Sequence, residues 1–262
     1  MIKHIFCDLD GTLYQKGISK EDIDAIKEIE EKGVRFHIAT GRAFKQAFQM
    51  TKDKVNLNGY YICQNGAFVY DKDKNIILKE VIDDKLVKKV ISRFESDDSY
   101  IYVIYNGDIV ISGGEDILDR YDRDCIIDSN FFGKECFDNL VGNIGIISKN
   151  TEELRRMELY YKSEFYDILD VYLSGPRVLS ISPKHISKRS AIKHVCGLLN
   201  TDLDEIATIG DSPNDICMLD GFKYSFAMES SKDEVKKCAS YTAKSVKDAI
   251  KEIEKINNIE NI

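Results

Sequence analysis

The sequence predicts an α/β protein, in which a mostly parallel, Rossmann-like sheet carries helices on both faces and a second α/β domain is inserted. Short apolar runs alternate with helical patterns in the first and last thirds of the 262-residue chain. Several apolar runs end directly in acidic or hydroxyl residues, which is typical of ligand-binding strand ends in open sheets. The middle, residues 83–182, repeats the alternation and is long enough for its own domain.

The chain begins with a predicted strand, loop and helix. The apolar strand ends at Cys7, and Asp8-Leu9-Asp10-Gly11-Thr12 follows where it opens into a loop. Ser19 and Asp22 have the spacing of a capping box, so a helix is expected to start there. Gly33 marks the end of that helix, and the crossover to the next parallel strand is expected to be right-handed.

Two further strands of the first 82 residues end in polar motifs. Residues 34–39 run into Thr40-Gly41-Arg42, and residues 60–63 run into Gln64-Asn65-Gly66-Ala67. In residues 183–262, Ser187-Lys188-Arg189-Ser190 precedes a helix, and the strand at 206–209 runs into Gly210-Asp211-Ser212-Pro213-Asn214-Asp215. The other elements predicted there are a helix near 214–219, strands near 224–228 and 241–243, and a final helix from Val246.

Residues 83–182 are predicted to form the inserted domain, while 1–82 and 183–262 form the core. Asn106-Gly107, between strands at 101–105 and 109–111, is a strong signal for a hairpin turn. The other elements predicted in the insert are helices over 86–94 and 154–165 and strands near 168–173 and 178–181.

Composition narrows the function classes. A net charge of −8 and a pI near 5.2 argue against a nucleic-acid-binding surface. No apolar stretch approaches the ~20 residues of a membrane span, and the early Asp8 is unlike a signal peptide. Seven cysteines without metal spacing indicate reduced thiols, and Cys7 is expected to be a buried strand residue. A cytoplasmic protein is therefore expected.

The residues at the strand ends suit phosphoryl transfer. Carboxylates form acyl-phosphate intermediates, so one of Asp8 and Asp10 can serve as nucleophile and the other as acid/base. Converging carboxylates need a cation, and oxygen ligands without His or Cys favour Mg²⁺ over zinc. Thr40-Gly41-Arg42 offers a hydroxyl, an open amide and a guanidinium to a phosphate, whose charge Lys188 would help to neutralise.

In this order, the motifs resemble the four motifs of the haloacid dehalogenase superfamily. They are Asp8-Leu9-Asp10-Gly11-Thr12, Thr40-Gly41-Arg42, Lys188, and Gly210-Asp211-Ser212-Pro213-Asn214-Asp215. The chain most resembles the Cof-like phosphatases (type IIB), which carry a large α/β cap of the C2 kind between the second and third motifs. Gln64-Asn65-Gly66-Ala67 resembles that group's Asn-Gly element, whereas the middle of the chain matches mainly by position and length.

The resemblance implies a role for each acidic residue. Asp8 would attack phosphorus and become an aspartyl phosphate. Asp10 would protonate the leaving alcohol and then activate water. The Asp8 carboxylate, the Asp10 backbone carbonyl and the Asp211 carboxylate would hold Mg²⁺, with Asp215 in support. A helix-capping role for Asp211 and Asp215 is compatible with metal binding.

The resemblance also implies that Thr40 and Lys188 hold the phosphoryl oxygens. Further substrate contacts are expected from Gly41, Arg42, Asn65 and Asn214, with surface and turn roles as alternatives for Arg42 and Asn65. The family pattern has glycine after the lysine, whereas this chain has Arg189, and Lys184 lies close enough in sequence to be an alternative. His185, near this motif, is expected to be a hinge or solvent residue.

Three functions fit the motifs. The first is a Mg²⁺-dependent phosphatase of a small phosphorylated metabolite, such as a sugar phosphate, flavin mononucleotide or pyridoxal phosphate. The second is a phosphomutase of the phosphomannomutase type, and the third is a non-catalytic metabolite-binding protein. Transport ATPases carry Thr where Asp10 stands, so Asp10 favours hydrolysis or transfer to another alcohol. The oligomeric state is not predicted.

Overall fold

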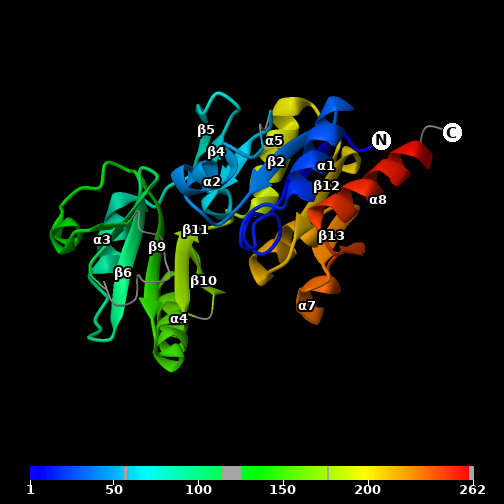
Figure 1. Ribbon diagram of the computed structural model, residues 1–262. Helices are drawn as coiled ribbons and strands as arrows, with labels where there is room; N and C mark the ends of the chain where they lie inside the picture. The colour runs from blue at the N-terminus through cyan, green and yellow to red at the C-terminus, as the bar shows by residue number, and fades with distance from the viewer. Residues whose placement is uncertain (56–57, 114–124, 176, 260–262) are drawn as a thin grey trace. The chain divides into compact units, whose positions relative to one another are not determined.

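The computed structural model describes residues 1–55, 58–113, 125–175 and 177–259. The chain folds into two compact units, which are labelled by element in Figure 1. The first unit consists of Met1–Leu78 and Ser187–Ile262, and the second consists of Lys79–Ile186. These bounds differ by a few residues from the division expected at 83 and 182.

The first unit is built on an eight-stranded sheet of order β14-β13-β12-β1-β2-β3-β4-β5. The central strand β1 pairs in parallel with β2 and β12, whereas β3 pairs antiparallel with β4. The strands are β1 (His4–Cys7), β2 (Arg35–Ala39), β3 (Tyr61–Cys63), β4 (Phe68–Tyr70), β5 (Ile76–Lys79), β12 (Ile206–Gly210), β13 (Tyr224–Met228) and β14 (Tyr241–Ala243). The predicted fold class, a mostly parallel α/β sheet, is confirmed.

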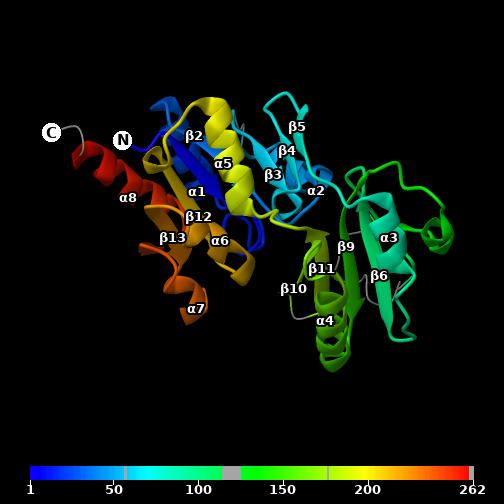
Figure 2. The ribbon, with the colours of Figure 1, turned by 180° about the vertical axis from the view of Figure 1, so that it is seen from behind.

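Helices cover both faces of this sheet. α1 (Lys20–Glu31) and α8 (Val246–Ile259) lie side by side on one face in Figure 1. α5 (Lys188–Leu199) and α6 (Ile216–Leu219) contact each other and lie on the opposite face, which Figure 2 shows from behind. Two more helices, α2 (Phe44–Thr51) and α7 (Asp233–Lys236), flank the sheet. Burial of apolar helix faces against the strands supplies the main stabilising term.

The start of α1 differs from the predicted capping box. The Asp22 backbone N–H donates to Ser19 Oγ at 3.0 Å, as expected of an N-cap. However, the buried Asp22 carboxylate accepts from the Ser19 hydroxyl and from the backbone N–H of Lys247, at the start of α8. Asp22 therefore connects the first turns of two helices rather than closing one box. Gly33, with φ near +89°, follows the helix end as predicted.

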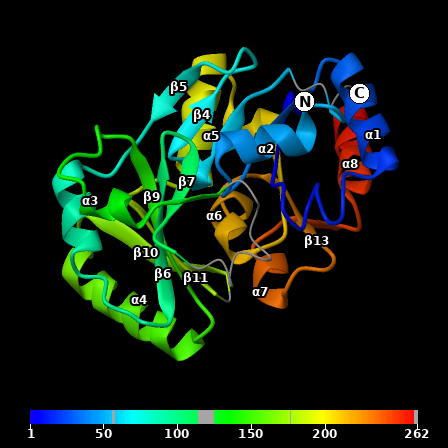
Figure 3. The ribbon, with the colours of Figure 1, turned by 60° about the vertical axis from the view of Figure 1, so that its left-hand side comes forward.

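The second unit has a six-stranded sheet of order β10-β11-β9-β6-β7-β8, with helices α3 and α4 on one of its faces (Figure 3). Its elements are α3 (Asp84–Ile91), β6 (Ser99–Tyr105), β7 (Asp108–Ile111), β8 (Cys125–Ile127), β9 (Val141–Ser148), α4 (Thr151–Phe165), β10 (Leu169–Gly175) and β11 (Val178–Pro183). The predicted hairpin is confirmed: β6 and β7 pair antiparallel, and both Asn106 and Gly107 have positive φ. Within the described part of the chain, no helix combines the length and apolarity needed to cross a bilayer.

Candidate active site

Four neighbouring strands of the parallel region end at one edge of the sheet. β3, β2, β1 and β12 run in the same direction, so their carboxyl ends meet there. The residues that follow these strands are Gln64, Thr40, Asp8 and Asp211. The strand order thus brings the predicted motifs to one edge, and side-chain hydrogen bonds connect the loops that carry them.

The Lys188 ammonium joins two of these loops. α5 begins at Lys188 because Ser187 and Ser190 form a capping box around its first turn. Lys188 is fully buried, and its Nζ lies 2.5 Å from Asp8 Oδ1 and 2.6 Å from Asp215 Oδ1. A single cation is therefore shared by two buried carboxylates from β1 and from the loop after β12.

Asp215 uses both carboxylate oxygens within the protein. While Oδ1 accepts from Lys188, Oδ2 accepts from the backbone N–H groups of Asp211 and Ser212, both at 3.0 Å. The absence of a side chain at Gly210 makes this turn possible, since a Cβ there would lie 2.6 Å from Asp215 Cβ. Asp215 thus caps the turn and orients Lys188, as a first-turn acid would, whereas the N-cap is Ser212 and not Asp211.

Asp211 approaches the loop after β1. Its Oδ1 accepts from the Thr12 hydroxyl at 2.7 Å. Gly11 permits this approach, because a Cβ there would lie 2.4 Å from Asp211 Oδ2 and its φ is near +85°. The glycine and threonine that follow Asp10 in the first motif therefore place the β12 carboxylate beside the β1 loop.

The charges at this edge shift the pKa values of three groups. Burial raises the pKa of Asp8, and the Asp215 carboxylate adds to this rise while Lys188 opposes it. Burial alone would lower the pKa of Lys188, but the Asp215 and Asp8 carboxylates hold it above its usual range. Burial also raises the pKa of Asp211, with the Thr12 hydroxyl opposing the rise. The carboxylates at this edge therefore carry more negative charge than the Lys188 ammonium balances.

The donor set fits a hard divalent cation. Asp8, Asp211 and Asp215 each offer a carboxylate oxygen, and these oxygens lie within 4.8 Å of one another. Mg²⁺ prefers oxygen ligands, and one ammonium does not balance three carboxylates. Asp215 is the least available of the three, because both of its oxygens already accept hydrogen bonds.

The loops after β2 and β3 form a second part of the site. The Asn65 backbone N–H donates to the Thr40 carbonyl, and the Arg42 N–H donates to Thr40 Oγ1 at 3.1 Å. A Cβ at Gly41 would lie 3.2 Å from Asn65 Oδ1, so glycine leaves room for this amide. The Asn214 amide donates to Asn65 Oδ1 at 3.2 Å and connects these loops to the β12 loop.

The Asp10 side chain lies apart from the other carboxylates. It is absent from the carboxylate cluster and instead accepts two hydrogen bonds from Arg42, from Nε at 2.7 Å and from Nη2 at 2.8 Å. Both side chains are partly exposed. Sequence reasoning treated the two residues separately and did not predict this pair.

The structure separates Lys188 from its sequence neighbour Lys184. Lys184 belongs to the second unit, where it donates to the Tyr166 carbonyl and lies 3.3 Å from Asp170. The His185 backbone N–H donates to the same Asp170 carboxylate. Lys184 is therefore not an alternative to Lys188 in the acidic cluster.

Several residues of this edge were not assigned a role from the sequence. The signal for Thr12 and Ser212 lay in the motifs themselves, since each hydroxyl is adjacent to a motif acid or glycine. Gln64 is harder to recognise: its side chain is buried, φ is near +52°, and both amide atoms have no partner among the described residues. Buried unpaired polar groups are costly, so Gln64 is a further candidate for ligand contact.

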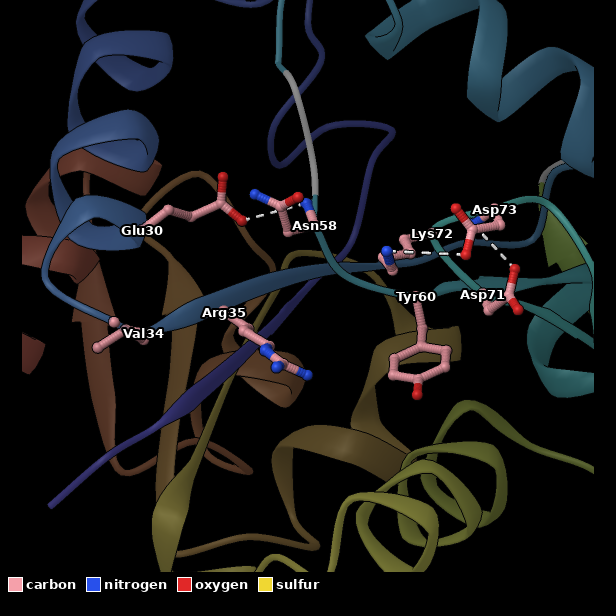
Figure 4. Close-up of a pocket in the computed structure, with 9 residues that line it drawn as sticks. Glu30, Val34, Arg35, Asn58, Tyr60, Asp71, Lys72 and Asp73 are labelled. Atoms are coloured by element: carbon pink, nitrogen blue, oxygen red, sulfur yellow. Dashed lines mark hydrogen bonds and ion pairs between the residues drawn. The ribbon is translucent and has the colours of Figure 1, made fainter.

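A pocket of about 600 Å³ elsewhere in the first unit carries different chemistry (Figure 4). It includes Val34 and Arg35 at the amino end of β2, whereas Thr40 follows the carboxyl end of that strand. The Tyr60 side chain lies near the charged turn that contains Lys72, whereas the Arg35 side chain lies apart from that turn. Because none of the motif residues lines it, this pocket is not the candidate active site.

The fold and the acidic strand-end site define a class, the α/β enzymes of phosphoryl transfer. The chain matches the model of the haloacid dehalogenase-like hydrolases over residues 5–252, and it belongs to that family. The resemblance stated from its motifs is thereby confirmed. Curated relatives that it matches are named phosphatases. One of them, the 5-amino-6-(5-phospho-D-ribitylamino)uracil phosphatase YcsE of Bacillus subtilis, is 25% identical over 247 residues, covering 92% of this chain and 89% of the relative.

Solved structures share the whole fold. TM0651 from Thermotoga maritima superposes with a TM-score of 0.84 at 23% identity, covering 96% of this chain and 97% of that chain. The sugar phosphatase BT4131 of HAD subclass IIB has a TM-score of 0.79 at 22% identity, covering 97% of this chain and 99% of that chain. At these identities the superpositions establish the fold, and the protein is an enzyme of a hydrolase family whose relatives are phosphatases.

Proposed function

We propose that the protein is a Mg²⁺-dependent phosphatase that hydrolyses a small phosphorylated metabolite through an aspartyl phosphate at Asp8. The observation that carries the proposal is the buried Lys188 ammonium, held between Asp8 and Asp215. An ion pair with a purely structural role needs one carboxylate. This lysine contacts two carboxylates, and a third, that of Asp211, lies close to them. Such an excess of buried charge is costly, and it is typical of sites that bind ions.

Hydrolysis follows in two steps. An Asp8 carboxylate oxygen attacks phosphorus, the ester P–O bond breaks, and the Asp10 carboxylic acid gives its proton to the leaving oxygen. Asp10 then takes a proton from water, the resulting hydroxide attacks phosphorus, and the bond between phosphorus and Asp8 breaks. Inorganic phosphate leaves, and Asp8 and Asp10 return to their starting states. The proton that Asp10 gives to the leaving alcohol in the first step is replaced in the second step by a proton from water.

Asp8, the Asp10 carbonyl and Asp211 would hold Mg²⁺, with Asp215 in support through Lys188. The ion would supply positive charge to the phosphoryl oxygens when bound. Lys188 supplies a second positive charge from the protein itself, and its ammonium stays charged because two carboxylates flank it.

Thr40, Gly41, Arg42, Asn65 and Asn214 are proposed to position the phosphoryl group and its ester. The Thr40 hydroxyl accepts from the Arg42 N–H, and among the described residues no acceptor takes the Thr40 proton. That proton is therefore available to a phosphoryl oxygen. The amides of Asn65 and Asn214 face each other and add polar groups from two further loops.

The second unit, residues 79–186, is proposed to act as a cap that selects the leaving group. The names of relatives support a phosphorylated sugar or sugar-alcohol substrate, since YcsE is named for a phosphoribityl compound and BT4131 for sugar phosphates. None of the seven cysteines forms a disulfide in the described structure, which suits action in a reducing cytoplasm.

The test is release of inorganic phosphate from a panel of phosphorylated metabolites, including mannose and glucose phosphates, with Mg²⁺ and with EDTA. Phosphate release that EDTA abolishes is the expected result, and Asp8→Asn should lower it by at least about a thousandfold. Isomerisation of a sugar phosphate without phosphate release would reassign the enzyme as a mutase. Full activity of Asp8→Asn would overturn the proposed mechanism.

A further inference from the structure

The carboxylate of the proposed acid/base, Asp10, forms an ion pair with the side chain of Arg42. Both of its carboxylate oxygens accept from the Arg42 guanidinium, at 2.7 and 2.8 Å. Among the described residues, no other side chain donates a hydrogen bond to the Asp10 carboxylate. In this arrangement both oxygens face the guanidinium, which leaves each only its second lone pair for water or a leaving group.

We propose that the phosphoryl group of the substrate displaces the Asp10 carboxylate from the Arg42 guanidinium, and that this exchange releases Asp10 for catalysis. The inference rests on the proposed function, since it assigns Arg42 a positioning role in that reaction. Arg42 would then hold the phosphate while Asp10 turns to the leaving oxygen. When phosphate departs, the two side chains pair again.

The surroundings of Arg42 suit such an exchange. Its backbone is held at both ends, because its N–H donates to Thr40 Oγ1 and its carbonyl accepts from the Gln64 N–H. The Arg42 backbone is thus anchored two residues from the threonine that is proposed to bind a phosphoryl oxygen, and only the Arg42 side chain has to move. The Asp10 loop is likewise closed by backbone hydrogen bonds, from Gly11 N–H to the Tyr14 carbonyl and from Tyr14 N–H to the Leu9 carbonyl.

Energetics favour phosphate as the competing partner. The Asp10 side chain is 46% exposed and Arg42 is 29% exposed, so water screens their attraction and the pair is weak. A phosphate dianion presents more negative charge than one carboxylate and also accepts a bidentate guanidinium. Loss of the Asp10 pair is therefore offset when a phosphoryl group arrives.

A double-mutant cycle on phosphate binding tests the exchange. The dissociation constant of inorganic phosphate is measured by calorimetry, with Mg²⁺ present, for the wild type, Asp10→Ala, Arg42→Ala and the double variant. Removing the competitor should tighten phosphate binding by about two- to fivefold in Asp10→Ala. Asp10→Asn should show a smaller gain, because the amide oxygen still accepts one hydrogen bond. In the Arg42→Ala background, Asp10→Ala should leave phosphate affinity unchanged.

The cycle separates exchange from simpler explanations. Equal tightening with and without Arg42 would mean that Asp10 acts only through its charge, and it would overturn the proposal. Unchanged or weaker phosphate binding in Asp10→Ala would do the same. Arg35→Ala, at the opposite end of β2, is the matched control and should bind phosphate like the wild type. Phosphate release that depends on Asp8, together with a cycle without coupling, would refute the exchange alone and leave the proposed function standing.

Discussion

At the scale of single residues, the site depends on how buried charge is balanced. Lys188 has no exposed surface, and each of its two carboxylate partners is buried as well. If the ammonium is removed, Asp8 and Asp215 remain close together in a poorly solvated place. Breaking a buried ion pair by removing one partner costs about 3–5 kcal/mol, because the remaining charge has no compensation.

Lys188→Met should therefore lower the free energy of unfolding by about 3–5 kcal/mol and abolish phosphatase activity. Denaturant unfolding in EDTA measures the stability without help from a bound ion. Lys184→Met is the matched control: it removes a partly exposed lysine from the second unit and should cost less than about 1 kcal/mol. Equal stability of Lys188→Met and wild type would show that the two carboxylates do not repel each other in the folded protein.

A second residue-scale prediction concerns a buried pair of histidines on β1 and β2. The Tyr60 backbone N–H donates to His37 Nδ1, and His37 Nε2 lies 3.0 Å from His4 Nδ1. His4 Nε2 lies 3.1 Å from the Thr201 hydroxyl. Because His37 Nδ1 accepts, its proton is on Nε2 and points at His4 Nδ1, so both rings are neutral. A second proton on either ring would have no acceptor among the described residues.

Burial lowers the pKa of His4 to about 4 and that of His37 well below its usual value of 6.5. As pH falls below about 6.5, the unfolded chain takes up protons that the folded protein excludes, so stability falls by up to about 1.4 kcal/mol per pH unit for each ring. The stability is fully present above pH 6.5. Unfolding at pH 7.5 and pH 5 should show the loss, and it should shrink in the double variant His4→Gln/His37→Gln. His194→Gln, which changes an exposed histidine, should keep the wild-type dependence.

The acids of the site were predictable because each follows an apolar strand directly. Their partners were not, because the contacts depend on tertiary structure: Asp8 meets Lys188 from 180 positions away, and Thr12 meets Asp211 from 199 positions away. The pairing of Asp10 with Arg42 depends on side-chain rotamers that no spacing encodes. These rotamers place Asp10 outside the carboxylate cluster that the other motif acids form.

At the scale of elements, turn and capping residues predicted the strands and helices at whose ends they lie. The hairpin at Asn106-Gly107 is an example, since both residues adopt the positive φ that the turn requires. β9 was missed because all eight of its residues are buried and it shows no alternation of polar and apolar side chains. A strand buried on both faces cannot be recognised by a period of two, and Gly142, Asn143 and Gly145 interrupt its apolar run.

Asp22 offers a prediction at this scale, because it stabilises the starts of α1 and α8 together. Asp22→Ala removes the acceptor of the Ser19 hydroxyl and leaves the Lys247 N–H without its partner. The free energy of unfolding should fall by about 1–3 kcal/mol. Asp24→Ala, on the exposed side of the same helix, is the control and should change stability by less than about 0.5 kcal/mol. If both variants unfold alike, the connection between the two helices contributes no stability.

At the scale of the whole molecule, the two units differ in whether one continuous segment of the chain forms them. The second unit is continuous, from Lys79 to Ile186, and its core is formed by residues of its own helices and strands, such as Val90, Ile144 and Leu154. The first unit is discontinuous. Its central strand β1 needs β2 from the first segment and β12 from the last segment as hydrogen-bonded neighbours.

Residues 79–186 produced alone should therefore fold, whereas residues 1–78 produced alone should not. The first segment lacks α5, α8 and β12, so one edge of β1, the sheet face that α5 covers and part of the face that α1 shares with α8 would remain in water. The isolated second unit retains its complete six-stranded sheet and both helices. Circular dichroism with denaturant titration should give a cooperative transition for 79–186 and none for 1–78. A non-cooperative transition of 79–186 would mean that the second unit depends on the first for its stability, and that division of the chain into two compact units does not extend to folding.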